Sequence, residues 1–168
     1  MDNSNGKGKV SQNIIISVVG GHDITNEVEQ LAHKIGGIVA AEGAILVCGG
    51  LDGAMTAVAK GCKDAGGTTI GLLPGKDKKD ANRYIDIALP TSIGYARNAI
   101  VACSADIIVA LPGSHGTRCE ISYGLVYGRP VIDLGNWNIK GMIKARNLSE
   151  AKRKIKECIQ MIKRKGRC

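Results

Sequence analysis

The chain has 168 residues, 44% of them hydrophobic, so it can bury one sizeable core and is expected to form a single domain. Twenty-three glycines, one tryptophan and no phenylalanine indicate a core of small and branched aliphatic side chains joined by tight turns. No apolar run approaches the roughly 18 residues that a membrane span needs, and residues 1–9 lack the apolar segment of a signal peptide. We therefore expect a cytoplasmic protein without membrane contact.

The formal net charge of +8 is concentrated near the end of the chain. Residues 140–168 contain eleven Lys and Arg against two Glu, a net charge of +9, so the other 139 residues carry −1. No aromatic residue is interleaved with these cations, which favours a solvated helix face over a nucleic-acid surface. Nucleic acid is therefore the last-ranked of the partners considered.

The six cysteines show no C-x-x-C spacing, and Cys48 and Cys103 lie in apolar surroundings that favour free buried thiols. We predict neither a disulfide framework nor a structural metal site.

The first half of the chain reads as a right-handed βαβαβ unit. Residues 1–12 are polar and are predicted to be a disordered lead-in to one domain at 13–163. The continuous β-branched run that follows is typical of a strand covered on both faces. The elements predicted next are, in order, a strand at 14–19, a helix that Thr25 or Asn26 caps and Gly43 ends, a strand at 44–48, a helix at 54–65 and a strand at 68–73.

The second half repeats the alternation of strand and helix after a charged loop at 74–83. The last helix begins at the capping pattern Asn147-x-x-Glu150 and leads to a basic tail at 164–168. The elements predicted before it are a strand at 84–89, a helix that Thr91 or Ser92 caps and that runs through 95–102, a strand at 106–110, a helix that Thr117 opens and that reaches Tyr127, and a strand at 131–134.

Glycine-rich loops follow several of the predicted strands. In a parallel sheet such loops meet at the carboxyl edge, where ligands bind. A single glycine pair is more often a turn, but several such loops ahead of helix starts favour a phosphate-bearing small molecule. A further loop of this kind is Gly135–Trp137. The candidate binding residues are Gly20, Gly21, Gly49, Gly50, Gly53, Met55, Pro112, Gly113, Ser114, His115, Gly116 and Thr117.

The stretch Leu111–Glu120, LPGSHGTRCE, is the strongest of these candidates. Pro112 ends a strand, the two glycines permit close backbone approach, and Thr117 is expected to open the next helix. Thr117-x-x-Glu120 also fits a capping box, so a structural and a functional role for Glu120 both stay open. His115 fits either an acid–base group or, more commonly for one loop histidine, a hydrogen-bonding residue. A G-x-G-x-x-G segment after a strand and a P-loop are both absent, which disfavours NAD binding and ATP hydrolysis.

Two of these segments resemble the motifs of a known family. VCGGLDGAM at 47–55 is similar to the GGGxxGxM segment of the Lonely Guy family, and Leu111–Glu120 is similar to its PGGxGTxxE segment. Arg97 aligns with the family's preceding arginine. The same resemblance covers the molybdenum-cofactor carrier proteins of this SLOG superfamily, and it spans roughly residues 12–163. It implies a Rossmann-like α/β fold with a doubly wound, mostly parallel sheet, a homodimer or homotetramer, and a nucleotide-type ligand.

In Lonely Guy enzymes, often mislabelled lysine decarboxylases, the motif arginine and glutamate serve hydrolysis of the N-glycosidic bond of a nucleoside 5′-monophosphate. Carried over by resemblance, Arg97 stabilises charge around the ribose, and Glu120 steers water or the oxocarbenium-like sugar. Ser114 stands where the motif has its second glycine, and Arg97-Asn98 stands for an Arg-Lys pair.

The length of this chain and its basic tail resemble the small carrier branch more closely than they resemble the Lonely Guy enzymes. We therefore expect a protein that binds a phosphorylated nucleotide-like or pterin-like molecule, such as a nucleoside monophosphate or molybdopterin, and that requires no cofactor. The alternative is a phosphoribohydrolase that releases base and ribose 5-phosphate. No lysine is marked as a pyridoxal phosphate anchor, so a decarboxylase is not expected.

Overall fold

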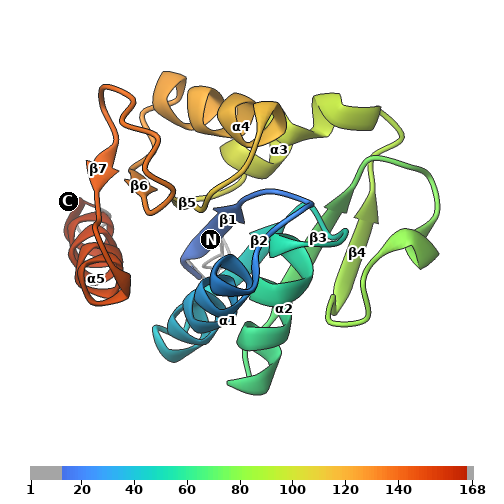
Figure 1. Cartoon of the computed structure of the whole chain (residues 1–168), viewed down its shortest axis with the longest axis horizontal. Helices are drawn as coiled ribbons and strands as arrows, with labels where there is room; N and C mark the ends of the chain where they lie inside the picture. The colour runs from blue at the N-terminus through green and yellow to red at the C-terminus, as the bar shows by residue number, and fades with distance from the viewer. Residues whose placement is uncertain (1–12, 166–168) are drawn as a thin grey trace, which may run out of the picture.

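A parallel sheet of seven strands forms the centre of the computed structural model, which describes residues 13–165 (Figure 1). The strand order β4-β3-β2-β1-β5-β6-β7 places β5 beside β1, so the order reverses between these two strands, and in such folds ligands bind at the carboxyl ends of the strands at this point. The expected lead-in at 1–12 lies outside the described residues. The strands are β1 (Ile15–Val19), β2 (Ile45–Cys48), β3 (Thr69–Leu73), β4 (Ile87–Pro90), β5 (Ile107–Ala110), β6 (Val131–Asp133) and β7 (Ile143–Lys144).

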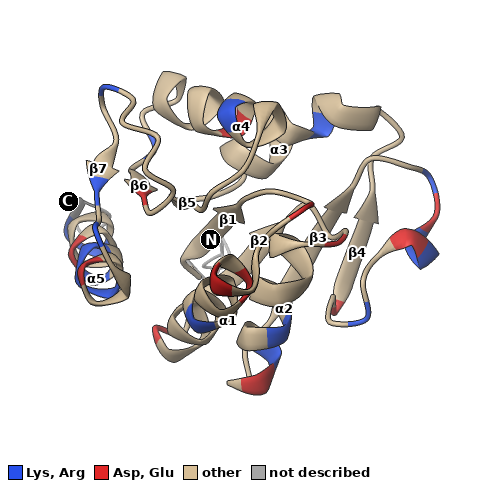
Figure 2. Cartoon of the chain, in the orientation of Figure 1, with Lys and Arg blue, Asp and Glu red and all other residues tan. Residues whose placement is uncertain are grey.

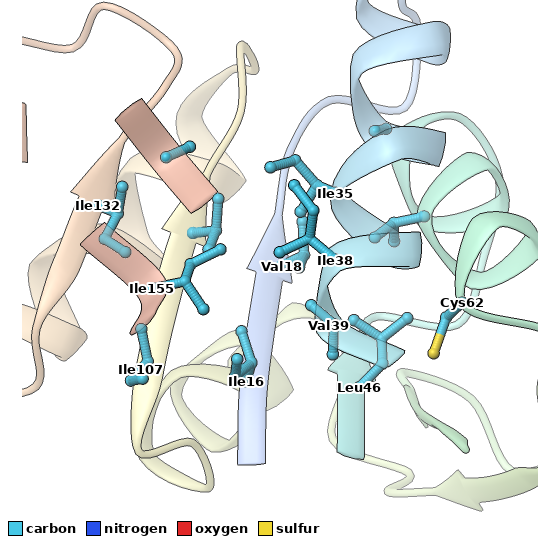
Figure 3. Packing of buried hydrophobic residues seen from close by; sticks show 14 of the residues in the cluster. Ile16, Val18, Ile35, Ile38, Val39, Leu46, Cys62, Ile107, Ile132 and Ile155 are labelled. Carbon is cyan, nitrogen blue, oxygen red and sulfur yellow. The ribbon is translucent and has the colours of Figure 1, made fainter. Parts of the chain in front are cut away.

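Helices cover both faces of the sheet, as the predicted Rossmann-like α/β fold requires. Alternate strand residues face opposite ways, so Ile16 and Val18 belong to one core and Val19 to the other. Figure 3 shows the first core, where Ile35 of α1 and Ile155 of α5 pack toward the sheet. That face is covered by α1 (Asn26–Ala41), α2 (Ala54–Asp64) and α5 (Leu148–Lys165), and the other by α3 (Asn98–Cys103) and α4 (His115–Val126).

Two predictions of helix starts are wrong, and one strand was missed. The helix expected through 95–102 begins only at Asn98, because Ser92 has a left-handed φ of 59° and Gly94–Arg97 forms the 3₁₀ turn η2. Helix α4 begins at His115 with Ser114 as N-cap, so Thr117 does not open it. The short strand β7 was not predicted, since two residues carry no periodic pattern.

The basic end of the chain is largely a helix face. Helix α5 extends through Lys165, so residues 164 and 165 of the expected tail are helical, and 166–168 lie outside the described residues. Figure 2 shows Lys and Arg along this helix. Several of its cations pair with carboxylates: Arg153 and Lys154 contact Glu157, and Lys156 contacts Glu42, the C-cap of α1. No helix within 13–165 is long and apolar enough to cross a membrane.

Helices α1 and α2 touch through their backbones. Gly36 faces the α2 backbone so closely that a Cβ would overlap the Val58 carbonyl oxygen, and a Cβ on Gly61 would overlap the His33 carbonyl oxygen. By contrast, a Cβ on Gly37 would lie 3.8 Å from its nearest neighbour, the Gly61 carbonyl oxygen. Of these two adjacent glycines in α1, Gly36 has no room for a side chain and Gly37 has room for a methyl group.

We expect Gly36→Ala to lower the free energy of unfolding by about 2 kcal/mol or more, because the helices must separate to admit the methyl group. Gly37→Ala is the matched control and should raise it by up to about 1 kcal/mol, through helix propensity alone. Urea unfolding of both variants measures the two changes. Equal changes in the two variants would contradict the proposed backbone contact.

Candidate functional site

The loops after β1, β2 and β5 meet at the carboxyl edge of the sheet, as the sequence predicts. The Gly21 amide donates to the Pro112 carbonyl oxygen at 3.0 Å, and the Ala54 amide donates to the Gly21 carbonyl oxygen at 3.0 Å. A Cβ on Gly20 would lie 2.8 Å from the Ala54 Cβ and 3.2 Å from the Leu111 Cβ. Gly20 and Gly21 therefore allow three loops to pack together, and the Gly21 amide is used within the protein.

The loop from Pro112 to Thr117 brings the start of α4 to this edge. Gly113 lies against Thr117, where a Cβ would overlap the Thr117 Oγ1, and Thr117 is buried. The amide of Arg118 donates to the Ser114 carbonyl oxygen at 3.0 Å, which is the first hydrogen bond of the helix. The backbone amides before Arg118 therefore have no acceptor within the helix. These amides and the helix dipole make the start of α4 suited to an anion. Ser114 and His115 are exposed beside it.

The side chain of Arg97 is buried where η2 meets this edge, with 4% of the residue exposed. Its Nη2 donates to the Gly49 carbonyl oxygen at 3.3 Å, and its Nη1 donates to Asn98 Oδ1. A Cβ on Gly49 would lie 2.5 Å from Nη2 and 2.6 Å from the Met55 Sδ. Gly49 thus permits the guanidinium to reach the end of β2.

Glu120 faces Arg97 across this buried space. Its Oε1 lies 3.6 Å from the Arg97 Nη1, which is an ion pair longer than a hydrogen bond. Burial raises the pKa of Glu120 to about 8, and the Arg97 charge offsets only part of that rise. Burial also lowers the pKa of Arg97, because desolvation disfavours both charges. Since Glu120 faces Arg97 and α4 starts at His115, the capping-box interpretation of Thr117 and Glu120 is wrong.

One donor of the Arg97 guanidinium has no partner. Among the described residues, its buried Nε makes no hydrogen bond. A buried donor without an acceptor costs about 1–3 kcal/mol, and an acceptor from a bound molecule would remove this cost. Arg97 is therefore a candidate ligand contact as well as a partner of Glu120.

Other predicted site residues shape the loop after β2. Gly50 has a φ of +74°, and a Cβ there would lie 3.0 Å from the Gly71 Cα. Gly53 has a φ of +68° immediately before α2, where a Cβ would overlap the His22 carbonyl oxygen. Sequence reasoning missed Asn82, whose amide donates to the Gly50 carbonyl oxygen at 2.9 Å. It stands in a charged loop, where nothing in the sequence distinguishes it.

The fourth loop also reaches the site edge. The carboxylate of Asp133 accepts hydrogen bonds from the amides of Gly135, Trp137 and Asn138 at 2.9–3.1 Å. The Trp137 indole N–H donates to the Leu111 carbonyl oxygen at 3.0 Å. Asp133 was not predicted to have a role, although a carboxylate that ends a buried strand is a signal for such a turn.

Asn98 is a third site residue without a predicted role. It is buried, and besides the bond from Arg97 its Nδ2 donates to the Gly116 carbonyl oxygen at 3.5 Å. The sequence marked it as a departure from the Arg-Lys pair, which was the available signal. Asn98 therefore links η2 to the start of α4, and Gly116 takes part through its carbonyl.

The cysteines within residues 13–165 differ in how deeply they are buried. Cys48 is buried below the site, and burial raises the pKa of its thiol to about 12, so it stays protonated. Cys103 is only partly buried, in contrast to the prediction, and Cys119 is exposed. No cluster of three or more His, Cys, Asp or Glu that could hold a metal occurs in this range.

Known proteins share this fold. The molybdenum cofactor binding protein of Rippkaea orientalis is 32% identical, with a TM-score of 0.83 over 89% of this chain and 99% of that one. The molybdenum cofactor carrier protein of Chlamydomonas reinhardtii is 31% identical, with a TM-score of 0.81 over the same shares. A cytokinin riboside 5′-monophosphate phosphoribohydrolase of Mycobacterium tuberculosis is 29% identical over 66% of this chain and 64% of that protein. The family model of the SLOG cluster4 family matches residues 13–164, and the chain belongs to that family.

Proposed function

We propose that the protein binds a phosphorylated nucleotide-like or pterin-like small molecule at the carboxyl edge of the sheet. The observation that carries the proposal is the buried guanidinium of Arg97, which has an unpartnered Nε close to the start of α4. The similarity to a cofactor-binding protein and a cofactor carrier supports a carrier-type role.

A phosphate group fits the charges of this edge. The start of α4 supplies amide donors and partial positive charge, and Arg97 supplies a full positive charge. Glu120 is largely protonated at neutral pH, so it opposes an anion only weakly. The phosphate is shared by nucleoside monophosphates and phosphorylated pterins, and the rest of the ligand distinguishes them.

We expect Arg97→Gln to weaken binding at least about tenfold, because a charge-assisted hydrogen bond contributes about 1.5–3 kcal/mol. Calorimetric titration with AMP, GMP, a phosphorylated pterin and inorganic phosphate gives the dissociation constants. Arg164→Gln on α5 is the matched control and should leave them unchanged. If none of these four molecules bound to the wild-type protein, the proposal would be contradicted.

The same titration has an expected pH profile. Affinity for AMP should rise from pH 5 to about 7 as the phosphate becomes a dianion, and should fall above about 8 as Glu120 ionises. The folded-state pKa of Glu120 lies above its ordinary value of 4.5, so the folded protein also loses stability as the pH rises between these two values. Glu120→Gln should remove the alkaline fall in affinity. A fall that persists in this variant would assign it to another group.

The second candidate function is hydrolysis of a nucleoside 5′-monophosphate. Glu120 and Arg97 favour it, because a buried ionisable carboxyl lies opposite a guanidinium. In this function Arg97 stabilises charge around the ribose. Glu120, which ionises as the pH approaches about 8, stabilises the oxocarbenium-like sugar or orients water. The mycobacterial relative supports this alternative.

As a hydrolase, the protein should release free base and ribose 5-phosphate from AMP in stoichiometric amounts. Glu120→Gln should reduce kcat by at least about 100-fold, because it removes the charge that stabilises the transition state. Chromatography of the base measures the rate, with Glu157→Gln on α5 as the control. Base release at the wild-type rate in Glu120→Gln would remove Glu120 from catalysis.

We also propose that two copies associate through the face that carries α3 and α4. Ile87 and Leu89 of β4 pair in register with Ile70 and Leu72, so they lie on this face, and each is more than 40% exposed. Helix α3 has no charged residue, and the charged residues of α4 are exposed Arg118 and buried Glu120. Two copies of net charge +8 meet more readily at such a face than at α5 (Figure 2). Its other exposed apolar residues are Ile93, Tyr95, Ile100, Tyr123, Val126 and Tyr127.

We expect Val126→Glu to convert the oligomer to a monomer, because Val126 is 79% exposed beside a hollow of about 350 Å³ lined also by Tyr123. Met161→Glu, on the exposed face of α5, should leave the oligomer intact. Light scattering after gel filtration measures the mass. A monomeric wild-type protein, or dissociation of both variants, would overturn this assignment.

A further inference from the structure

Asn98 occupies the gap between the two charged residues of the site and the start of α4. It is 7% exposed, and both ends of its amide have partners: Oδ1 accepts from the Arg97 Nη1, and Nδ2 donates to the Gly116 carbonyl oxygen at 3.5 Å. The same Nη1 is the atom that lies 3.6 Å from Glu120 Oε1. Asn98 and Glu120 therefore face the same nitrogen of the guanidinium, and Asn98 is the one of the two within hydrogen-bond distance of it.

We propose that Asn98 is a positioning residue that holds the Arg97 guanidinium away from hydrogen-bond contact with Glu120. The guanidinium is fixed at two points, the Asn98 Oδ1 and the Gly49 carbonyl oxygen. Because Gly49 holds Nη2 and Asn98 holds Nη1, the rigid guanidinium would have to leave the position that these bonds set in order to approach the carboxyl more closely. The Gly116 contact ties this arrangement to the loop that begins α4.

The arrangement keeps two groups available at once. A closed pair of Arg97 and Glu120 would neutralise both charges and occupy the guanidinium that a phosphate needs. With the pair held open, Glu120 is protonated near neutral pH and Arg97 keeps its charge for a ligand. The role of Asn98 in binding rests on the proposed function, whereas its effect on Glu120 exists without a ligand.

The groups that act on Glu120 are few. Arg97 of η2 attracts the carboxylate, and Cys48 of β2 is the other titratable group that interacts with it among the described residues. The Cys48 thiol stays protonated up to a pH of about 12, so it contributes no charge in the range of interest. A change in the pKa of Glu120 therefore reports on its distance from the Arg97 guanidinium and on the charges beside that group.

The test is a ¹³C-carboxyl NMR titration of the ligand-free protein labelled at glutamate, with Glu120 assigned through Glu120→Gln. In Asn98→Ala the guanidinium is free to close onto Glu120, so the pKa of Glu120 should fall by about one pH unit or more. In Asn98→Asp the guanidinium is still held and a carboxylate is added, so the pKa should rise instead. Gln160→Ala on exposed α5 removes an amide elsewhere and should leave it unchanged.

Opposite directions in the two Asn98 variants support the positioning role, and AMP affinity should fall at least about fivefold in Asn98→Ala. A pKa of Glu120 that is unchanged in Asn98→Ala, or that falls in both variants, overturns it. If Asn98→Ala does not fold, Asn98→Asp alone decides the question, because a fall in that variant contradicts the proposal. A wild-type protein without AMP affinity counts against the proposed function and leaves this titration valid.

Discussion

Burial of the Arg97 guanidinium against the end of β2 is the interaction on which the rest of the site depends. A buried cation is tolerated only with hydrogen-bond acceptors and a countercharge nearby. Gly49 supplies a carbonyl oxygen and the space, Asn98 supplies an amide oxygen, and Glu120 supplies a loosely paired carboxyl. Each comes from a different element, so the folded sheet edge assembles the site.

The scaffold beneath the site is rigid for a related reason. Glycines permit backbone contact between α1 and α2 at Gly36 and Gly61, and between the loops after β1 and β5 at Gly21 and Gly113. At these positions the absence of a side chain serves packing rather than ligand access. The loops therefore cannot separate freely, so the proposed ligand would meet a backbone that is already in place.

The sequence could predict the fold because its strands are continuous apolar runs separated by helices of clear periodicity. It could also predict that the glycine loops meet, since parallel strands share one carboxyl edge. It could not predict which glycines shape turns, such as Gly50, because that depends on the neighbouring strand β3. The roles of Asn98 and Asp133 depend on contacts between elements distant in sequence, and no local pattern encodes them. The start of α4 was misplaced because Thr117 and Glu120 match a capping pattern that the buried ion pair overrides.

Trp137 gives the protein a built-in optical reporter. It is the chain's single tryptophan, its indole N–H bonds to the Leu111 carbonyl oxygen, and the Arg118 guanidinium lies 5.5 Å from its ring centre. Both contacts belong to the segment that carries the Pro112–Thr117 loop. Fluorescence excited at the red edge of indole absorption thus arises from one known place in the molecule, and events at that loop can be followed without attaching a dye.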